Sequence, residues 1–459
     1  MRFLIFMLSL ALAGTVSAQQ RSRGNGRMEV GVAQIDITPE GPIRLAGYGA
    51  REKSEANTVL RTISAKALAF GTDAQGISIM VTVDLVGIPG HITGEIARRL
   101  SKKTGLRRSN FTICASHTHG GPEVGNLLNI LQYRGETFSD SLLSLPQQQH
   151  ISLYIEQLTA KLEQVALVAL KTRSESLVSW GQGQLGFAKN RRQENGPVDN
   201  AMPIMVVKDL KGNLKAILVN YACHGTTLEG SMNEVHGDWM GEAQRIIQEK
   251  HPGSIAMVAI GCGADANPQP RGKTEHITQL GQSVSDEVDR LLGLPLTPLT
   301  RAPSGNFTSI ELPFEHVPNV AELVQQSDDK TVKGYYARLA LDRTARGDTI
   351  PSSQTYFIQT WSFGNELLMI FLAGEVVVDY SLRLKKELGP QRLWINAYAN
   401  DVPCYIGSRR IIREGGYEAE TSMYFYNKPS KFAEDVEELI IAAVHQLVPA
   451  SFQSSRLKK

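Results

Sequence analysis

Cysteine and net charge are both scarce in this sequence of 459 residues. It contains four cysteines and no CxxC pair, which argues against a thiolate zinc site. Three of the four end apolar runs, so we expect buried free thiols in preference to two disulfides. With 48 Lys and Arg against 46 Asp and Glu, the formal net charge is only +2. Composition therefore favours neither a nucleic-acid partner nor an anionic membrane surface.

Long apolar runs are also rare, and the clearest one lies at the start of the chain. The segment MRFLIFMLSLALAGTVSAQQ is apolar from Phe3 to about Ala13 and is followed by small residues up to Ala18. This run is short for a membrane-spanning helix, and the small residues match a cleavage site. We expect a signal peptide over residues 1–18 and a secreted or periplasmic protein. An uncleaved anchor is the alternative.

Between its ends the chain alternates strand-like and helical patterns. Runs such as ISIMVTVDLVG, KAILVNYACH and SIAMVAIGCGAD are almost continuously apolar, which is typical of strands covered on both faces. HITGEIARRLSKKTG has helical spacing and predicts a helix that ends at Gly105. We predict an α/β fold with a mixed β-sheet core flanked by helices. Residues 19–28 are expected to be a flexible mature N-terminus, 29–450 one catalytic domain and 451–459 a tail.

Polar side chains that can bind metal follow several of the predicted strands. His117 and His119 come after the run that ends at Cys114, His224 follows ILVNYAC, and Asp265 follows IAMVAIGCG. Open α/β sheets bind ligands in the crevice at the carboxyl ends of their strands. We therefore expect a metal site there. The alternative is that these are loop or core histidines with ordinary hydrogen bonds.

The pair His117 and His119 is the centre of this hypothesis. In extended backbone, residues two apart point the same way, so both imidazoles can face one site, one as a ligand and the other as second ligand, acid or donor. His236, in EVHGDWMG, is a weaker candidate because its loop is polar, and the adjacent Asp238 fits the cap of a following helix.

Carboxylate and cationic candidates come from later in the chain. Glu375 follows an apolar run and a glycine, although it also fits the acidic first turn of the next helix. The segments GFAKNRRQENG and VPCYIGSRRIIREGGYEAE are rich in arginine and tyrosine. They are consistent with an oxyanion-binding loop or with a salt-bridged surface. The candidate residues of the second segment are Tyr405, Arg409, Arg410, Arg413, Tyr417 and Glu418.

Five ordered blocks carry a resemblance to a known family. They are AGYGAR, ASHTHGGP, NYACHGT with HGDWMG, GCGADANP, and AGEV with YANDVPCY and GGYE. From about Glu29 to about Tyr426 the chain resembles the catalytic domain of the neutral/alkaline non-lysosomal ceramidases, which are zinc amidases that cleave the N-acyl bond of sphingolipids. The resemblance implies one Zn²⁺ per chain.

The resemblance also assigns roles to individual residues. It implies that zinc is held by His117, His224, Glu375 and Tyr405, while His119, Arg191 and Tyr417 act on the substrate amide. A zinc ion in such a site lowers the pKa of a bound water to about 7, and the resulting hydroxide attacks the carbonyl. His119 would then protonate the leaving amine. Arg192, next to Arg191, is the alternative arginine.

Two departures limit the comparison. Asn267, in GADANP, stands where the family has a serine, which argues against a serine nucleophile. We also expect no counterpart of the family's immunoglobulin-like C-terminal domain, since the sequence ends soon after the matching blocks. Hydrolysis of another amide or ester, or metal binding without catalysis, are the competing functions. The expected partner is a small N-acyl substrate, with a sphingolipid as one candidate and peripheral membrane contact as an open alternative.

Overall fold

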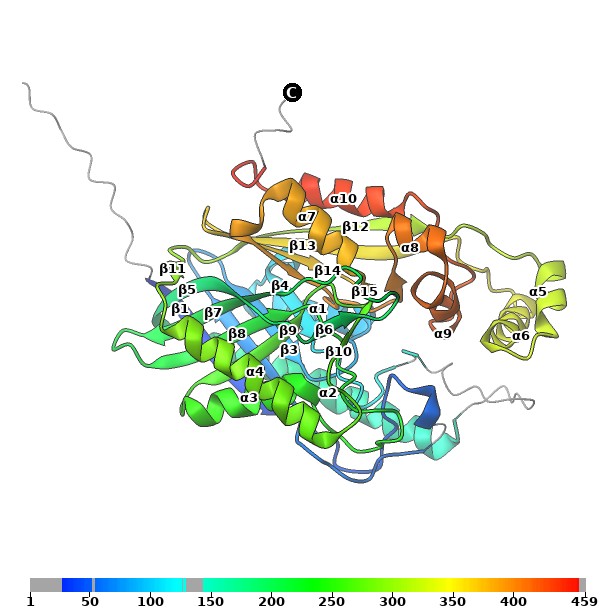
Figure 1. Cartoon of the computed structure of the whole chain (residues 1–459), viewed down its shortest axis with the longest axis horizontal. Coiled ribbons are helices and arrows are strands. Elements are labelled where there is room, and N and C mark those ends of the chain that lie inside the picture. Colours follow the sequence, from blue (N-terminus) through cyan, green and yellow to red (C-terminus); the bar gives the residue numbers. More distant parts are fainter. Residues whose placement is uncertain (1–26, 52–53, 126, 129–142, 454–459) are drawn as a thin grey trace, which may run out of the picture.

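The computed structural model describes residues 27–51, 54–125, 127–128 and 143–453. The expected signal peptide and most of the expected flexible N-terminus lie outside these residues. Two β-sheets pack face to face and helices cover their outer faces, so the molecule has four layers (Figure 1). This confirms the predicted α/β class with a mixed sheet flanked by helices. The second sheet explains why central strands are apolar on both faces.

The larger sheet has nine strands in the order β4-β3-β2-β1-β5-β7-β8-β9, with β11 paired to β5. The β3–β4 and β8–β9 pairs are parallel and the other pairs are antiparallel. Its strands are β1 (Arg27–Asp36), β2 (Ser64–Phe70), β3 (Ser78–Val83), β4 (Phe111–Ala115), β5 (Ser174–Gln184), β7 (Ala201–Asp209), β8 (Leu214–Tyr221), β9 (Ile255–Ile260) and β11 (Thr297–Pro298).

The smaller sheets bring later parts of the chain alongside. The four-stranded sheet has the order β12 (Ser304–Pro313), β13 (Ser353–Phe363), β14 (Leu367–Leu372) and β16 (Leu393–Asn396), with β14 and β16 parallel. Two short pairs lie beside it: β6 (Ala188–Asn190) with β10 (Ala266–Pro268), and β15 (Glu375–Val376) with β17 (Tyr405–Ile406). Aromatic side chains fill the space between the two main sheets, among them Phe70, Trp361, Phe371 and Trp394.

Helices form the two outer layers. On the larger sheet lie α1 (Gly90–Thr104), α2 (Leu145–Lys171), α3 (Asp238–Lys250) and α4 (Thr274–Leu292). On the smaller sheet lie α7 (Val378–Leu388) and α10 (Val436–Leu447). The remaining helices are α5 (Val320–Ser327), α6 (Val332–Ala345), α8 (Arg409–Glu414) and α9 (Ser422–Phe425).

Local sequence signals account for several helix ends. Helix α1 ends where expected, at Gly105, whose positive φ of 72° lets its N–H bond the carbonyl of Ser101. Helix α2 begins with a capping box in which Ser144 and Gln147 bond each other's backbone N–H groups. All four cysteines are free and buried, which confirms that prediction. Among the described residues, no helix combines the length and apolar character needed to cross a bilayer.

Candidate metal centre and substrate cavity

Four of the expected metal ligands converge on one point. His117 follows β4, His224 follows β8, and Glu375 and Tyr405 begin β15 and β17. The two histidine Nε2 atoms are 3.2 Å apart. Oε2 of Glu375 lies 3.1 Å from Nε2 of His117 and 3.3 Å from Nε2 of His224. The hydroxyl of Tyr405 is also 3.3 Å from Nε2 of His224.

The fold explains why residues so distant in sequence meet. Strands β4 and β9 are the two edges of the larger sheet, yet they contact each other because the sheet curls. A bridge between Thr118 and Gly225 then joins the two histidine loops. In the parallel pair β15–β17, Glu375 and Tyr405 are direct neighbours, so their side chains share one face.

His117 itself has a strained backbone. Its φ of 56° lies in the left-handed region, which residues with a side chain rarely adopt, and its ring stacks on Tyr398 with centroids 4.2 Å apart. Tyr398, Asp238 and Asn400 also have positive φ. Such strain gathers at functional sites, where the surrounding structure holds it in place.

The hydrogen bonds of the two ligand histidines leave a lone pair facing the centre on each ring. Nδ1 of His117 donates to the carbonyl of Val86 at 2.7 Å, and Nδ1 of His224 donates to that of Gly263 at 3.0 Å. In neutral rings both Nε2 atoms are then unprotonated, and Oε2 of Glu375 has no hydrogen-bond partner among the described residues. Three electron-rich atoms therefore face one another inside the protein.

A bound divalent cation accounts for this arrangement. In a tetrahedral zinc site with bonds of about 2.0–2.1 Å, neighbouring ligand atoms are about 3.3 Å apart. The observed separations between Nε2, Oε2 and hydroxyl oxygen, 3.1 to 3.3 Å, match that spacing. Metal-bound histidines also typically donate their other ring N–H to a carbonyl, as both do here. The residues present therefore fit zinc.

Electrostatics at the centre point the same way. Burial lowers the pKa of His224 to about 4, so the ring is neutral near pH 7. Burial alone would raise the pKa of Glu375, but the contacts with His117 and His224 hold it well below its usual range. A neutral imidazole and an ionised carboxylate are the forms that bind metal.

His119 lies beside the centre but differs from the other two histidines. Its Nε2 is 3.3 Å from Nε2 of His117, and the three histidines have ligand atoms within 4.8 Å of one another. Its Nδ1, however, has no hydrogen-bond partner among the described residues, unlike those of His117 and His224. Burial also lowers the pKa of His119 well below its usual value. His119 therefore differs from the typical metal-bound histidine, whose other ring nitrogen donates to a carbonyl or carboxylate.

Two further expected residues contact the metal centre from its open side. The Arg191 guanidinium donates to the hydroxyl of Tyr405 at 3.0 Å and to Glu418 at 2.8 Å. The Tyr417 ring lies 5.5 Å from that of Tyr405 and is 42% exposed. Arg192 bonds Glu418 and Glu414 but not Tyr405, so Arg191 is the arginine nearer the centre.

These side chains line a cavity of about 700 Å³ that opens over the metal centre. His119, His224, Tyr405 and Tyr417 form one part of its wall. The remaining lining residues are Gly47, Tyr48, Arg191, Arg192, Thr226, Asn267, Arg271, Glu414, Gly415, Gly416 and Glu418. The cavity therefore exposes two of the expected ligands, His224 and Tyr405, together with the expected substrate-binding groups to a bound molecule.

Comparison with known proteins identifies the fold and its family. Residues 28–259 match the family model described as neutral/alkaline non-lysosomal ceramidase, N-terminal, which is about half of the chain. The chain belongs to the neutral/alkaline non-lysosomal ceramidase family. The matched segment contains His117, His119, Arg191 and His224, whereas Glu375, Tyr405 and Tyr417 lie beyond it.

Relatives of this ceramidase-family chain extend the comparison. The neutral ceramidase of Drosophila melanogaster is 26% identical over 294 residues, which are 59% of this chain and 39% of that protein. That of Drosophila pseudoobscura pseudoobscura is 24% identical over 289 residues. The chain thus spans about two fifths of these relatives' length. The crystal structure of neutral ceramidase from Pseudomonas aeruginosa superposes with a TM-score of 0.70 at 17% identity, covering 93% of this chain and 76% of that one.

Other residues singled out in the sequence lie outside the centre. Asp265 accepts hydrogen bonds from the N–H of Val378 and from the side chain of Asn190, so it fixes the start of α7 and the end of β6, next to Arg191. The ring of His236 packs against Gly120, and its Nδ1 accepts a hydrogen bond from the N–H of Asp238. Asp238 is the first residue of α3, one position after the cap residue Gly237. Arg409, Arg410 and Arg413 form ion pairs with acidic neighbours, as the surface alternative predicts.

One contact of the centre was not expected from the sequence. The hydroxyl of Tyr426 donates to Oε1 of Glu375, which leaves Oε2 facing the two histidines. The sequence TSMYFYNK does not predict this contact, because a tyrosine eight residues after GGYE has no distinctive pattern. Tyr426 thus orients the carboxylate in the way that a carbonyl orients each histidine.

Proposed function

We propose that this protein is an exported zinc-dependent amidohydrolase of the neutral ceramidase type. It uses water to cleave the N-acyl amide bond of a ceramide-like or other N-acyl substrate. The observation that carries the proposal is the convergence of His117, His224, Glu375 and Tyr405 at the spacing of a tetrahedral zinc site. Membership of the family supports hydrolysis of an amide. The signal-peptide pattern of residues 1–18 supports export.

The residues of the centre would hold the ion and keep its environment fixed. When bound, zinc supplies a Lewis acid that polarises a carbonyl oxygen and lowers the pKa of a water molecule. The bonds from the histidine Nδ1 atoms to Val86 and Gly263 hold both rings in place. Arg191, which bonds the hydroxyl of Tyr405, keeps that oxygen directed at the centre.

Proton transfer is assigned to His119. Its Nε2 faces the centre, 3.3 Å from that of His117, and the ring also lines the cavity. A neutral ring there can take a proton from the attacking water and pass it to the leaving amine, which otherwise departs poorly. Arg191 and Tyr417 are placed on the open side, where they can stabilise negative charge on the carbonyl oxygen.

Metal analysis together with activity assays tests the proposal. We expect about one zinc per purified chain and hydrolysis of a short-chain ceramide, an N-acyl amino acid or both, in preference to the matched esters. A protein that holds no zinc, and gains none when zinc is added, would defeat it. Zinc without turnover on any N-acyl amide would instead favour a non-catalytic binding protein.

Two histidine variants separate the ligand from the proton carrier. We expect His117→Ala to lose zinc, and His119→Ala to keep it while turnover falls by about 10²–10⁴-fold. Zinc content is measured on both proteins after the same purification. If His119→Ala lost zinc as fully as His117→Ala, His119 would be a ligand and another group would have to carry the proton.

A further inference from the structure

Among the described residues that line the cavity, Arg271 is the arginine without a hydrogen-bond or ion-pair partner. Arg191 and Arg192 are both neutralised, since each bonds the Glu418 carboxylate and Arg192 also bonds Glu414. Arg271 follows β10 on the wall of the same cavity, and within the described part of the chain its guanidinium makes no hydrogen bond or ion pair. Because a guanidinium offers five donors in a planar fork, it fits a carboxylate.

A second donor lies beside it. Asn267 also lines the cavity, and its amide oxygen accepts a hydrogen bond from the hydroxyl of Thr226 at 3.4 Å. The NH₂ group of Asn267 is therefore the part of that amide left to donate. This wall presents one uncompensated positive charge and one free donor to whatever occupies the cavity.

The apolar surface of the described cavity lining comes from aromatic rings rather than from aliphatic side chains. Among the described residues, its lining includes no aliphatic side chain, only glycines, aromatic rings and polar or charged groups. A ceramide carries two long alkyl chains, and burying each CH₂ group gains about 0.8 kcal/mol only where apolar surface receives it. The described walls therefore suit a polar molecule better than a two-chain lipid.

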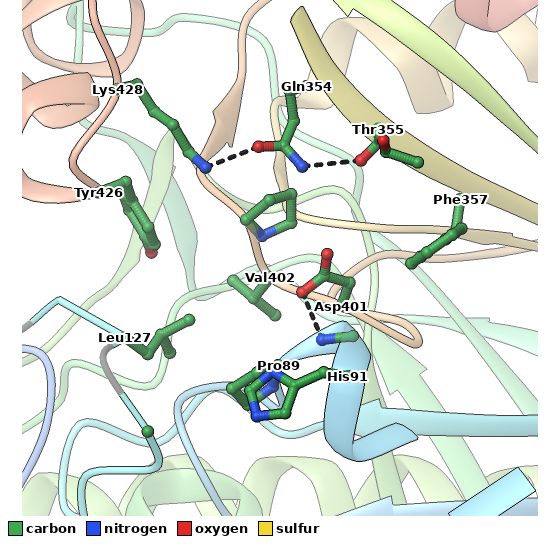
Figure 2. A pocket seen from close by; sticks show the side chains of 13 residues that line it. Pro89, His91, Leu127, Gln354, Thr355, Phe357, Asp401, Val402, Tyr426 and Lys428 are labelled. Carbon is green, nitrogen blue, oxygen red and sulfur yellow. Dashed lines mark hydrogen bonds between the residues drawn. The ribbon is translucent and has the colours of Figure 1, made fainter. Parts of the chain in front are cut away.

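Aliphatic side chains instead gather in a separate cavity of about 480 Å³, shown in Figure 2. Leu127 and Val402 line it together with the aromatic ring of Phe357, beside polar side chains such as Asp401 and Lys428. Its link to the metal centre is Tyr426, whose ring lines this cavity while its hydroxyl bonds Glu375. None of its lining residues also lines the cavity of Arg271. It therefore does not supply apolar walls to the metal site.

We propose that the preferred substrate is a small N-acyl amino acid, whose carboxylate is bound by Arg271 with help from Asn267. This inference rests on the proposed amidohydrolase function and narrows its substrate class. Charge-assisted, bidentate pairing of guanidinium with carboxylate is both stronger and more directional than a neutral hydrogen bond. The metal centre and Arg271 then hold the two polar ends of one molecule.

A matched substrate pair tests this with the zinc-loaded full chain. N-hexanoylglycine and N-hexanoylethanolamine differ in a carboxylate against a hydroxymethyl group, and kcat/KM is measured for both by release of hexanoate. We expect the glycine conjugate to be preferred by about tenfold or more. Arg271→Gln should bring the ratio close to one, and Arg271→Lys should keep part of it. Arg301→Gln, at an exposed arginine outside the cavity, is the matched control and should keep the wild-type ratio.

The outcomes separate this inference from the function on which it rests. If the wild type prefers the neutral compound, or if Arg271→Gln keeps the full preference, the carboxylate is not bound by Arg271 and the inference is wrong, although the amidase function stands. If neither compound nor a ceramide is cleaved, the amidase function fails. In that case calorimetry measures the Kd of the same two compounds for wild type and for Arg271→Gln. The ratio of the two Kd values then replaces the ratio of kcat/KM as the test of the inference.

Discussion

Replacing Tyr426 by phenylalanine removes a single oxygen atom next to the metal centre. The ring remains, so the wall of the second cavity is preserved. What is lost is the hydrogen bond to Oε1 of Glu375, a buried carboxylate that is 2% exposed. Without it, Oε1 has no other hydrogen-bond donor among the described residues, and the carboxylate is free to rotate away from His117 and His224.

The size of the effect follows from that bond. A hydrogen bond to a charged group contributes about 1.5–3 kcal/mol. If the bond is present when zinc is bound, its loss weakens zinc binding by about 10–100-fold, the range seen when groups that orient metal ligands are removed. Folding should be affected less, because the rest of the Tyr426 side chain still packs.

Competition with a chromophoric chelator measures this zinc affinity. Tyr398→Phe is a close control, since Tyr398 is also buried beside the centre and stacks on His117, but its hydroxyl has no partner among the described residues. We expect Tyr426→Phe to lose about 10–100-fold in zinc affinity and Tyr398→Phe to stay within about twofold. Equal losses in both variants, or no loss in Tyr426→Phe, would refute the reasoning that Tyr426 orients a zinc ligand.

Three further changes have outcomes that the structure fixes. Gly47 has a φ of +94°, and a Cβ there would lie 2.3 Å from Nδ1 of His119. Gly47→Ala should therefore displace His119 and reduce kcat by about tenfold or more, with zinc retained. Gly212→Ala is the control for backbone strain, because Gly212 has a φ of +90° and a Cβ there would have no neighbour within 4 Å. Burial lowers the pKa of Lys66 to about 8. Between about pH 8 and 10.5 the unfolded chain therefore binds more protons than the folded one, so the free energy of unfolding rises with pH. From pH 7.5 to 10 the wild type should gain about 2 kcal/mol of unfolding free energy relative to Lys66→Met. Urea denaturation of both proteins at the two pH values measures this. Arg44 is paired with Glu123 at 2.6 Å with both side chains buried, so Arg44→Leu should cost about 3–5 kcal/mol.

Each of these can fail in an informative way. Equal loss of activity in the Gly47 and Gly212 variants would mean that strain, not displacement of His119, is responsible. A pH-independent difference between wild type and Lys66→Met would mean that folding does not lower the pKa of Lys66. If replacing Arg44 and Glu123 together by leucine cost as much as Arg44→Leu alone, the unpaired Glu123 charge would not be the cause.

The sequence could suggest the histidines of the candidate centre because strand ends leave a clear pattern. An apolar run that stops at a histidine predicts both the strand and the placement of the side chain, and His117 and His224 have this pattern. Glu375 has it too, and its position at the start of β15 agrees. Tyr405 and Arg191 became candidates through family resemblance, since tyrosines and arginines are common in surface loops.

The sequence could not predict how the layers stack. Periodicity shows that a strand is apolar on both faces, but a helix and a second sheet cover such a face equally well. The packing of Phe70 against Trp361 depends on pairs almost three hundred residues apart. The contact of Tyr426 with Glu375 has the same origin, because it joins two side chains that lie 51 positions apart in the sequence.

The positions of the four expected ligands also have a mechanical consequence. His117 and His224 follow strands of the larger sheet, whereas Glu375 follows β14 of the smaller sheet and Tyr405 pairs beside it. An ion bound to all four would cross-link the two sheets at one edge of their shared core. Zinc binding would then stabilise the packing of the two sheets against each other. Adding zinc should raise the free energy of unfolding with the logarithm of the free zinc concentration. Chelation should loosen this edge first, so amide hydrogen exchange at the ends of β4, β8 and β14 would rise before exchange elsewhere in either sheet.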